Sequence, residues 1–143
     1  MMSGGERFVD GYLGYLLGQA NHALYKDFDS HVRAAGLSSI EWRVLAILQD
    51  SEPLAISQLA HEVLSKQPTV TKLVQRMADQ GWLTLLADPA DQRRTLVTAS
   101  AGGKRLVKPL LEKARAHECA MLRALAVPEQ AALKKLLAKL ARG

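Results

Sequence analysis

The chain has 143 residues, of which 48% are hydrophobic and 23% are charged, and its formal net charge is +5. This length predicts a single domain with a sizeable core, and the ordinary apolar content excludes a disordered chain. No apolar run approaches the roughly 18 residues that span a bilayer, and the opening residues are unlike a signal peptide. A single cysteine, Cys119, excludes an internal disulfide and a cysteine-based zinc cluster.

The charge is distributed unevenly along the chain. Residues 1–65 carry four Lys/Arg and eight Asp/Glu, residues 66–103 carry five and three, and residues 104–143 carry ten and three. The positive net charge favours an anionic partner without naming one. Because the basic excess lies mostly in the C-terminal part, the placement of individual side chains is a better guide to nucleic-acid binding than the net charge.

From Arg7 to Ala35 the apolar residues keep steps of three and four, which predicts one long amphipathic helix. Its apolar stripe is too long to be buried within so small a domain, which favours a partner chain. Gly11, Gly14 and Gly18 repeat at the same period. They either allow a partner helix or a ligand to approach closely, or they mark a frayed start with a firm helix only from Gln19.

A second helix follows the long one. Gly36 ends the first helix, and Ser38 with Glu41 three residues later is a capping-box pattern. The second helix should run to about Gln49. Trp42 lies on its apolar stripe, which is more typical of a core residue than of a ligand contact.

Two shorter helices come next. The first spans Ile56 to Val63, and because no capping side chain immediately precedes it, it is either poorly capped or begins earlier. The second starts near Gln67 and stops at Gly81, with one buried apolar face. Its other face is polar and cationic, which suits the major groove of DNA. The residues of this helix that we expect to meet DNA are Gln67, Pro68, Thr69, Thr71, Lys72, Gln75 and Arg76.

A β-hairpin is predicted after this helix pair, with strands at Leu83–Ala87 and Thr95–Ala99. The polar connection between them, residues 88–94, ends in Arg93 and Arg94 and is a plausible wing. Ser100 should cap a long helix, in which Pro109 marks either a kink or a late start.

The last helix begins after Ala126, with proline again near its start. Its leucines are expected to face inward and its lysines outward. The inward leucines are Leu133, Leu136, Leu137 and Leu140.

No catalytic or metal-binding pattern is present. The four histidines do not fall at metal-ligand spacing, and the chain has no glycine-rich phosphate loop and no nucleophile elbow. The sequence therefore predicts neither an enzyme nor a metal or other cofactor.

Several runs together resemble the MarR-type winged-helix regulators. They are Leu54–Ala60, Thr69–Met77 and Asp88–Arg93, with Trp42–Leu45 upstream and Ser100–Gly103 downstream. The sequence departs from the family pattern at a few positions, among them Leu64, where the turn often has glycine, and Lys72, where arginine is frequent.

The resemblance implies a mainly α fold with a small β-hairpin wing. Residues 37–99 would form the winged helix-turn-helix lobe, and residues 1–35 and 101–143 would be dimerisation helices within a single 1–143 domain. A homodimer would place two recognition helices on a pseudo-palindromic operator in double-stranded DNA. Arg93 and Arg94 would reach the flanking minor grooves, and Asp91 would orient Arg93 by an ion pair.

The resemblance also implies a cytoplasmic transcriptional repressor that is released by a small molecule. In that family, ligands sit between the dimer helices and the DNA-binding lobe. A small aromatic anion is the first class of effector to expect, and Cys119 should be buried and inert. The candidate effector-binding residues are Tyr15, Gln19, His22, Trp42 and Arg43. The alternative function is a helical module that uses the same fold to bind protein.

Overall fold

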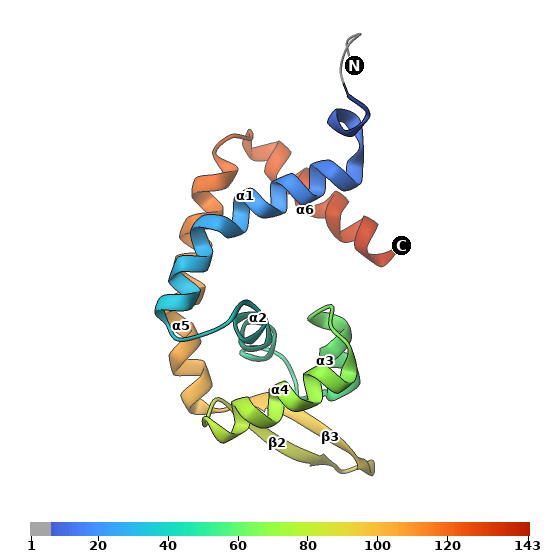
Figure 1. Cartoon of the computed structure of the whole chain (residues 1–143), viewed down its shortest axis with the longest axis vertical. Coiled ribbons are helices and arrows are strands. Elements are labelled where there is room, and N and C mark those ends of the chain that lie inside the picture. Colours follow the sequence, from blue (N-terminus) through green and yellow to red (C-terminus); the bar gives the residue numbers. More distant parts are fainter. Residues whose placement is uncertain (1–6) are drawn as a thin grey trace. The chain divides into compact units, whose positions relative to one another are not determined.

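The computed structural model describes residues 7–143 (Figure 1). Two compact units can be distinguished in the chain. Unit 1 comprises residues up to 26 and from 114 onward, and unit 2 comprises residues 27–113. The boundaries between the units fall inside two long helices, α1 (Leu13–Ala34) and α5 (Ala101–Leu122).

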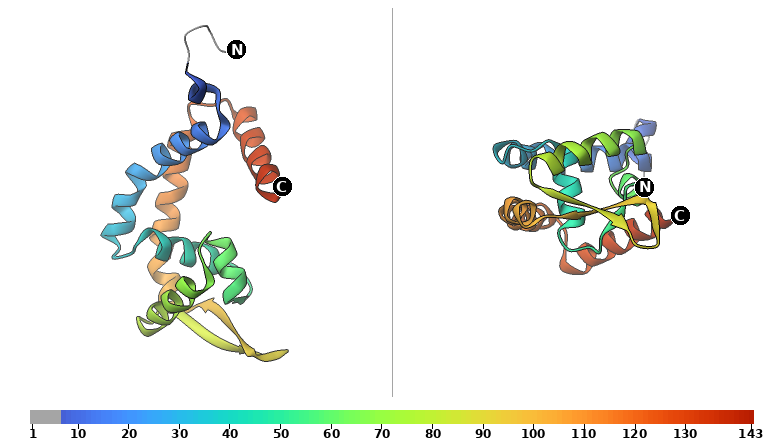
Figure 2. Two further views of the ribbon diagram at one scale, coloured as in Figure 1. Left: turned by 45° about the vertical axis from the view of Figure 1, so that its right-hand side comes forward. Right: turned by 90° about the horizontal axis from the view of Figure 1, so that it is seen from below.

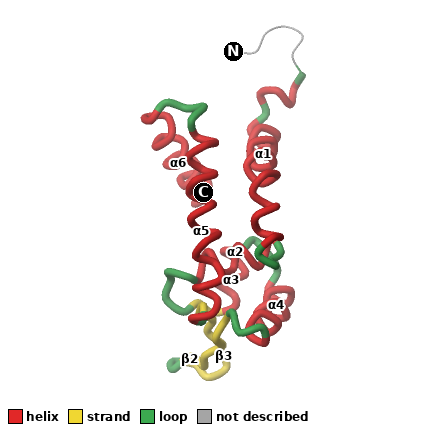
Figure 3. Tube along the Cα trace, turned by 90° about the vertical axis from the view of Figure 1, so that its left-hand side faces the viewer, coloured by secondary structure: helices red, strands yellow, loops and turns green. Residues whose placement is uncertain are grey.

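Unit 2 contains a small antiparallel sheet together with short helices. Between α1 and α5 its elements are, in chain order, α2 (Ser39–Leu48), β1 (Leu54–Ala55), α3 (Ile56–Glu62), α4 (Gln67–Asp79), β2 (Leu83–Asp88) and β3 (Asp91–Ala99). The strand order is β1-β3-β2, so β3 is the central strand. Figure 3 shows the strands confined to one end of the unit, and Figure 2 shows the β2–β3 hairpin extending beyond the helices.

The sheet differs from the predicted hairpin in two respects. Strand β1 pairs with β3 through Leu54 and Ala55, and two residues are too few to produce a strand pattern in the sequence. Strand β3 begins at Asp91 instead of Thr95, so Arg93 and Arg94 belong to a strand and not to a loop. The connection is therefore only two residues long, and its second residue, Ala90, donates its N–H to Asp88 Oδ1 at 2.9 Å.

The core of unit 2 is formed by α2, α3, α4, the sheet and the first turns of α5. Its fully buried members include Leu45, Leu48, Leu59, Val70, Val74, Met77, Val97 and Val107. The predicted apolar face of α4 is buried as expected. The capping box of α2 is also confirmed, because Ser38 Oγ accepts from the N–H of Glu41 and the carboxylate of Glu41 accepts from the N–H of Ser38.

The turn between α3 and α4 holds a backbone conformation that most residues avoid. Leu64 has a φ of 58° and is 86% exposed. It follows α3, whose last carbonyls accept from the N–H groups of Leu64 and Ser65. At its start, α3 has no capping side chain on Ala55, and Gln58 accepts from the N–H of Ala55 instead. The poor cap is thus confirmed, and the helix does not begin earlier than Ile56.

Unit 1 contains a short 3₁₀ helix (Phe8–Gly11), the first half of α1, the end of α5 and α6 (Val127–Arg142). The prediction of a single helix from Arg7 is wrong, because the extended backbone of Tyr12 separates the 3₁₀ turn from α1. The frayed start to Gln19 is wrong as well, since Gly14 and Gly18 lie within the helix. A Cβ at Gly18 would meet nothing within 4 Å in this chain.

The C-terminal helices also modify the predictions. Helix α5 begins at Ala101 and continues through Pro109, so the late start is wrong. The inward packing predicted for the leucines of α6 is made only in part. Leu133 and Leu137 line an apolar cavity with residues of α1 and α5, whereas Leu136 and Leu140 are each 58% exposed. Polar contacts also join α6 to α5, since Gln130 donates to the carbonyl oxygen of Leu122 and Lys134 pairs with Glu118.

Candidate nucleic-acid interface

The polar face of α4 is open to solvent along its whole length. Of its predicted DNA contacts, Lys72 and Gln75 are exposed, and their side chains make none of the side-chain hydrogen bonds or ion pairs found in residues 7–143. The hydroxyl of Thr71 donates to the carbonyl oxygen of Gln67 at 3.0 Å. Arg76 Nη2 lies 4.0 Å from Glu41 Oε2, so a nearly buried carboxylate holds this cation near the end of the helix.

The wing presents two arginines that are each paired with an aspartate. Asp91 Oδ1 accepts from the Nε of Arg93 at 3.2 Å, which is the predicted ion pair, and it also accepts from the N–H of Arg93 at 3.1 Å. Arg94 Nη1 lies 3.8 Å from Asp88 Oδ2. The Arg93 side chain remains 92% exposed, so the pair restricts its position without covering it.

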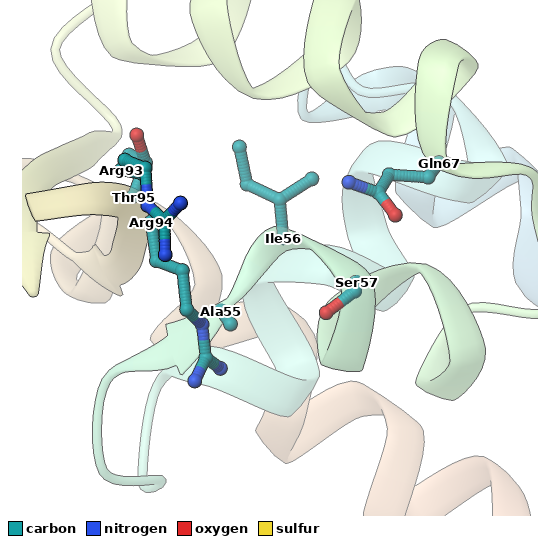
Figure 4. Close-up of a pocket in the computed structure, with 7 residues that line it drawn as sticks. All are labelled: Ala55, Ile56, Ser57, Gln67, Arg93, Arg94 and Thr95. Carbon is teal, nitrogen blue, oxygen red and sulfur yellow. The ribbon is translucent and has the colours of Figure 1, made fainter. Parts of the chain in front are cut away.

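A polar cavity of about 170 Å³ joins the wing to the helix-turn-helix. Its lining residues are Ala55, Ile56, Ser57, Gln67, Arg93, Arg94 and Thr95. Figure 4 shows Gln67 on one side and the two arginines on the other, with Ile56 between them. The fold thus brings together three predicted DNA-binding residues and adds Ser57 and Thr95, which sequence reasoning missed. The only sequence signal for Ser57 was its place in the first turn of α3.

The five predicted effector-binding residues are divided between the units. In unit 1, Tyr15 is half-buried, whereas Gln19 and His22 are exposed. In unit 2, Trp42 is 8% exposed and its ring centroid lies 5.3 Å from that of Phe28, which confirms the core position favoured by its spacing.

Arg43, the fifth candidate, is bound to the main chain. Its Nη1 donates to the carbonyl oxygen of Val63 at 2.9 Å, which connects α2 to the turn after α3. Its Nε is buried and has no hydrogen-bond partner among the described residues.

Cys119 is exposed, so the expectation that it is buried is wrong for this chain. Within residues 7–143, no group of three or more His, Cys, Asp and Glu side chains is arranged to hold a metal ion. No helix of the described part has the length and apolar character needed to cross a membrane.

Comparison with known proteins places this geometry in a family. A sequence profile described as the MarR family matches residues 35–94. An HTH-type transcriptional repressor of Mycobacterium tuberculosis is 27% identical over 92% of this chain and 94% of its own length.

Two solved structures extend the comparison to nearly the whole chain. NadR in complex with 4-hydroxyphenylacetate is 26% identical, with a TM-score of 0.85 and coverage of 99% of this chain and 98% of that one. A MarR family transcriptional regulator of Silicibacter pomeroyi is 37% identical, with a TM-score of 0.81 and coverage of 94% of this chain and 99% of that one. The present chain is therefore a member of the MarR family of winged helix-turn-helix, DNA-binding transcriptional regulators.

Proposed function

We propose that this protein is a homodimeric repressor that binds a pseudo-palindromic operator in the bacterial cytoplasm. The observation that carries the proposal is the open polar face of α4 next to the arginines of the wing. An exposed helix with hydroxyl, amide and cationic side chains reads base edges and phosphates in a major groove. The similarity to a transcriptional repressor of Mycobacterium tuberculosis supports repression as the mode of regulation.

Exposed apolar side chains in unit 1 support the homodimer. Apolar residues that lie on helices and are left uncovered in one chain mark a surface that another chain covers. The most exposed of them are Phe8, Tyr12, Leu13, Leu16, Val127, Leu136 and Leu140. A two-fold dimer through these helices would place two recognition helices roughly 34–36 Å apart, on one face of the DNA.

A footprint on the DNA upstream of the protein's own coding region tests this function. We expect protection of two half-sites about one helical turn apart, with binding that weakens steeply as salt rises. The second candidate function is a module that binds protein. A chain that protects no DNA segment at moderate salt, and that selects no duplex from a random pool, would favour that module.

We propose a small aromatic anion as the effector. NadR, with which this chain shares its fold, was crystallised with 4-hydroxyphenylacetate, which belongs to this class. Arg43 supports the charge, because its guanidinium would form charge-assisted hydrogen bonds with a carboxylate. The other candidate contacts are Tyr15, Gln19 and His22, since Trp42 is a core residue.

Operator affinity measured with a panel of aromatic acids tests this effector class. We expect at least one hydroxyphenyl carboxylate to weaken binding, and Arg43→Met to reduce that response more than Arg33→Met, since Arg33 pairs with Asp29 on the surface. The same assay with peroxide separates a redox switch from a ligand switch. Release of the wild type by peroxide but not of Cys119→Ser, with no effect of any acid, would contradict the proposal.

A further inference from the structure

The C-terminal end of α4 and the first turn of α5 are in close contact within unit 2. We call this contact, which involves Gly81, Trp82, Ser100, Gly102 and Gly103, the joint. Helix α4 ends in a turn in which Trp82 donates its N–H to the carbonyl oxygen of Met77 and Gly81 donates to Ala78. Gly81 has a φ of 83°, a conformation that glycine adopts without strain. The carbonyl oxygens of Gly81 and Trp82, which follow α4, are both available to accept hydrogen bonds from Ser100.

Ser100 binds this turn to α5 through both functions of its hydroxyl. Its Oγ accepts from the N–H of Gly103 at 3.0 Å, which caps α5, and donates to the carbonyl oxygen of Gly81 at 2.6 Å. The N–H of Ser100 donates to the carbonyl oxygen of Trp82 at 3.1 Å. A hydroxyl can accept one hydrogen bond and donate another at the same time, so the two roles together require a serine or a threonine here.

Two glycines of α5 bring the backbones into direct contact at the same point. A Cβ on Gly103 would lie 2.1 Å from the carbonyl oxygen of Trp82, and a Cβ on Gly102 would lie 2.9 Å from that of Gly81. No side chain therefore separates α5 from the end of α4. Packed contacts without free space transmit displacements instead of absorbing them.

We propose that Ser100 is a positioning residue for DNA binding, which holds the recognition helix α4 to α5 so that the two move as one body. The inference rests on the proposed role of α4 as the helix that reads DNA. It goes beyond that role because it attributes the coupling between α4 and α5 to the hydroxyl of Ser100. This hydroxyl is not one of the proposed DNA contacts.

Three substitutions separate the capping role of Ser100 from its connecting role. Ser100→Thr retains the hydroxyl and both roles. Ser100→Asp retains an oxygen that caps α5 but places a carboxylate, which has no proton to donate, against the carbonyl oxygen of Gly81. Ser100→Ala loses both roles. Ser38→Ala is the matched control, because Ser38 caps α2 through Glu41 and makes no bond to another element among the described residues.

Amide hydrogen exchange without DNA reports on the joint itself. We expect the amides of Gly81 and Trp82 to exchange about five- to tenfold faster in Ser100→Asp and Ser100→Ala, as the loss of one hydrogen bond predicts. Ser100→Thr and Ser38→Ala should leave these amides within about twofold of the wild type. Equal exchange in the Asp and Thr variants would overturn the inference.

Affinity for a duplex selected by the wild type reports on positioning. We expect Ser100→Asp and Ser100→Ala to bind about five- to tenfold more weakly, and Ser100→Thr and Ser38→Ala to bind within about twofold of the wild type. Faster exchange with unchanged affinity in the Asp variant would overturn the inference while leaving the proposed function intact. A wild type that selects no duplex would remove the proposed function, whatever the exchange data show.

Discussion

A single oxygen of Asp91 holds Arg93 by two bonds, one to its main-chain N–H at 3.1 Å and one to its Nε at 3.2 Å. The pair lies at the start of β3, beside the two-residue turn of the wing. It limits the positions of the Arg93 side chain, which is 92% exposed. If this side chain binds DNA, part of the conformational entropy that it would lose on binding is therefore already lost in the free protein.

Arg93→Ala should weaken operator binding by about tenfold if, as we propose, its guanidinium enters a narrow minor groove beside each half-site. Asp91→Asn should weaken it less, since Arg93 stays but is held less firmly. Fluorescence anisotropy with a labelled operator measures both. Glu52→Gln, a change of a carboxylate on an exposed loop, is the control, and an Arg93→Ala variant that binds as tightly as the control would contradict the role of the wing.

Lys72→Ala should lower the slope of log affinity against log salt by about one unit if the ammonium group neutralises one phosphate. Lys72 is exposed on α4 and has no partner among the described side chains, so its loss should not disturb the fold. The measurement is operator binding over a range of salt concentrations. Lys139→Ala, on the exposed side of α6, should leave the slope unchanged, and equal slopes in the two variants would exclude the contact.

Leu64→Gly should raise the free energy of unfolding by roughly 0.5–1 kcal/mol. The left-handed backbone costs a non-glycine residue about 1–2 kcal/mol, and the greater freedom of glycine in the unfolded chain cancels part of the gain. Little apolar burial is lost because the side chain is 86% exposed. Denaturant unfolding checks the prediction, and a Leu64→Ala variant, which keeps the strain, should show no gain.

Gly103→Ala should lower the free energy of unfolding by about 2–3 kcal/mol, because the new Cβ would overlap the carbonyl oxygen of Trp82. Gly18→Ala makes the same chemical change inside a helix where a Cβ would meet nothing within 4 Å. It should raise the free energy of unfolding by as much as about 1 kcal/mol. Thermal unfolding of both variants compares the two effects. If both variants changed the melting temperature by a similar amount in the same direction, the backbone around Trp82 would be able to move aside for the new Cβ at little cost.

Leu136→Glu should convert a dimer into monomers or weaken it strongly, because a charge would replace an exposed apolar side chain of unit 1. Lys135→Glu reverses a charge on the neighbouring exposed position and serves as the control. Analytical ultracentrifugation over a concentration range measures the assembly. A wild type that stays monomeric at all concentrations would contradict the proposed homodimer.

Local patterns in the sequence predicted those parts of the fold that depend on residues close together in the chain. The capping box of Ser38 and Glu41 and the glycine stop at Gly81 are set by bonds that span only a few residues. The buried face of α4 follows from helical period alone. The opposite face of α4 was predicted to be polar, and its side chains are the ones that remain exposed.

Contacts between distant residues decided what the sequence could not. Strand β1 exists because Leu54 pairs with Val97, and the start of β3 at Asp91 is set by its partner strand. The cavity that joins Ser57 to the wing, and the bond from Ser100 to Gly81, link residues that no local pattern relates. Sequence periodicity reports which face of a helix is apolar, whereas only the tertiary structure decides whether the same chain covers that face. For this reason Leu136 and Leu140 of α6, which the sequence placed inward, are exposed.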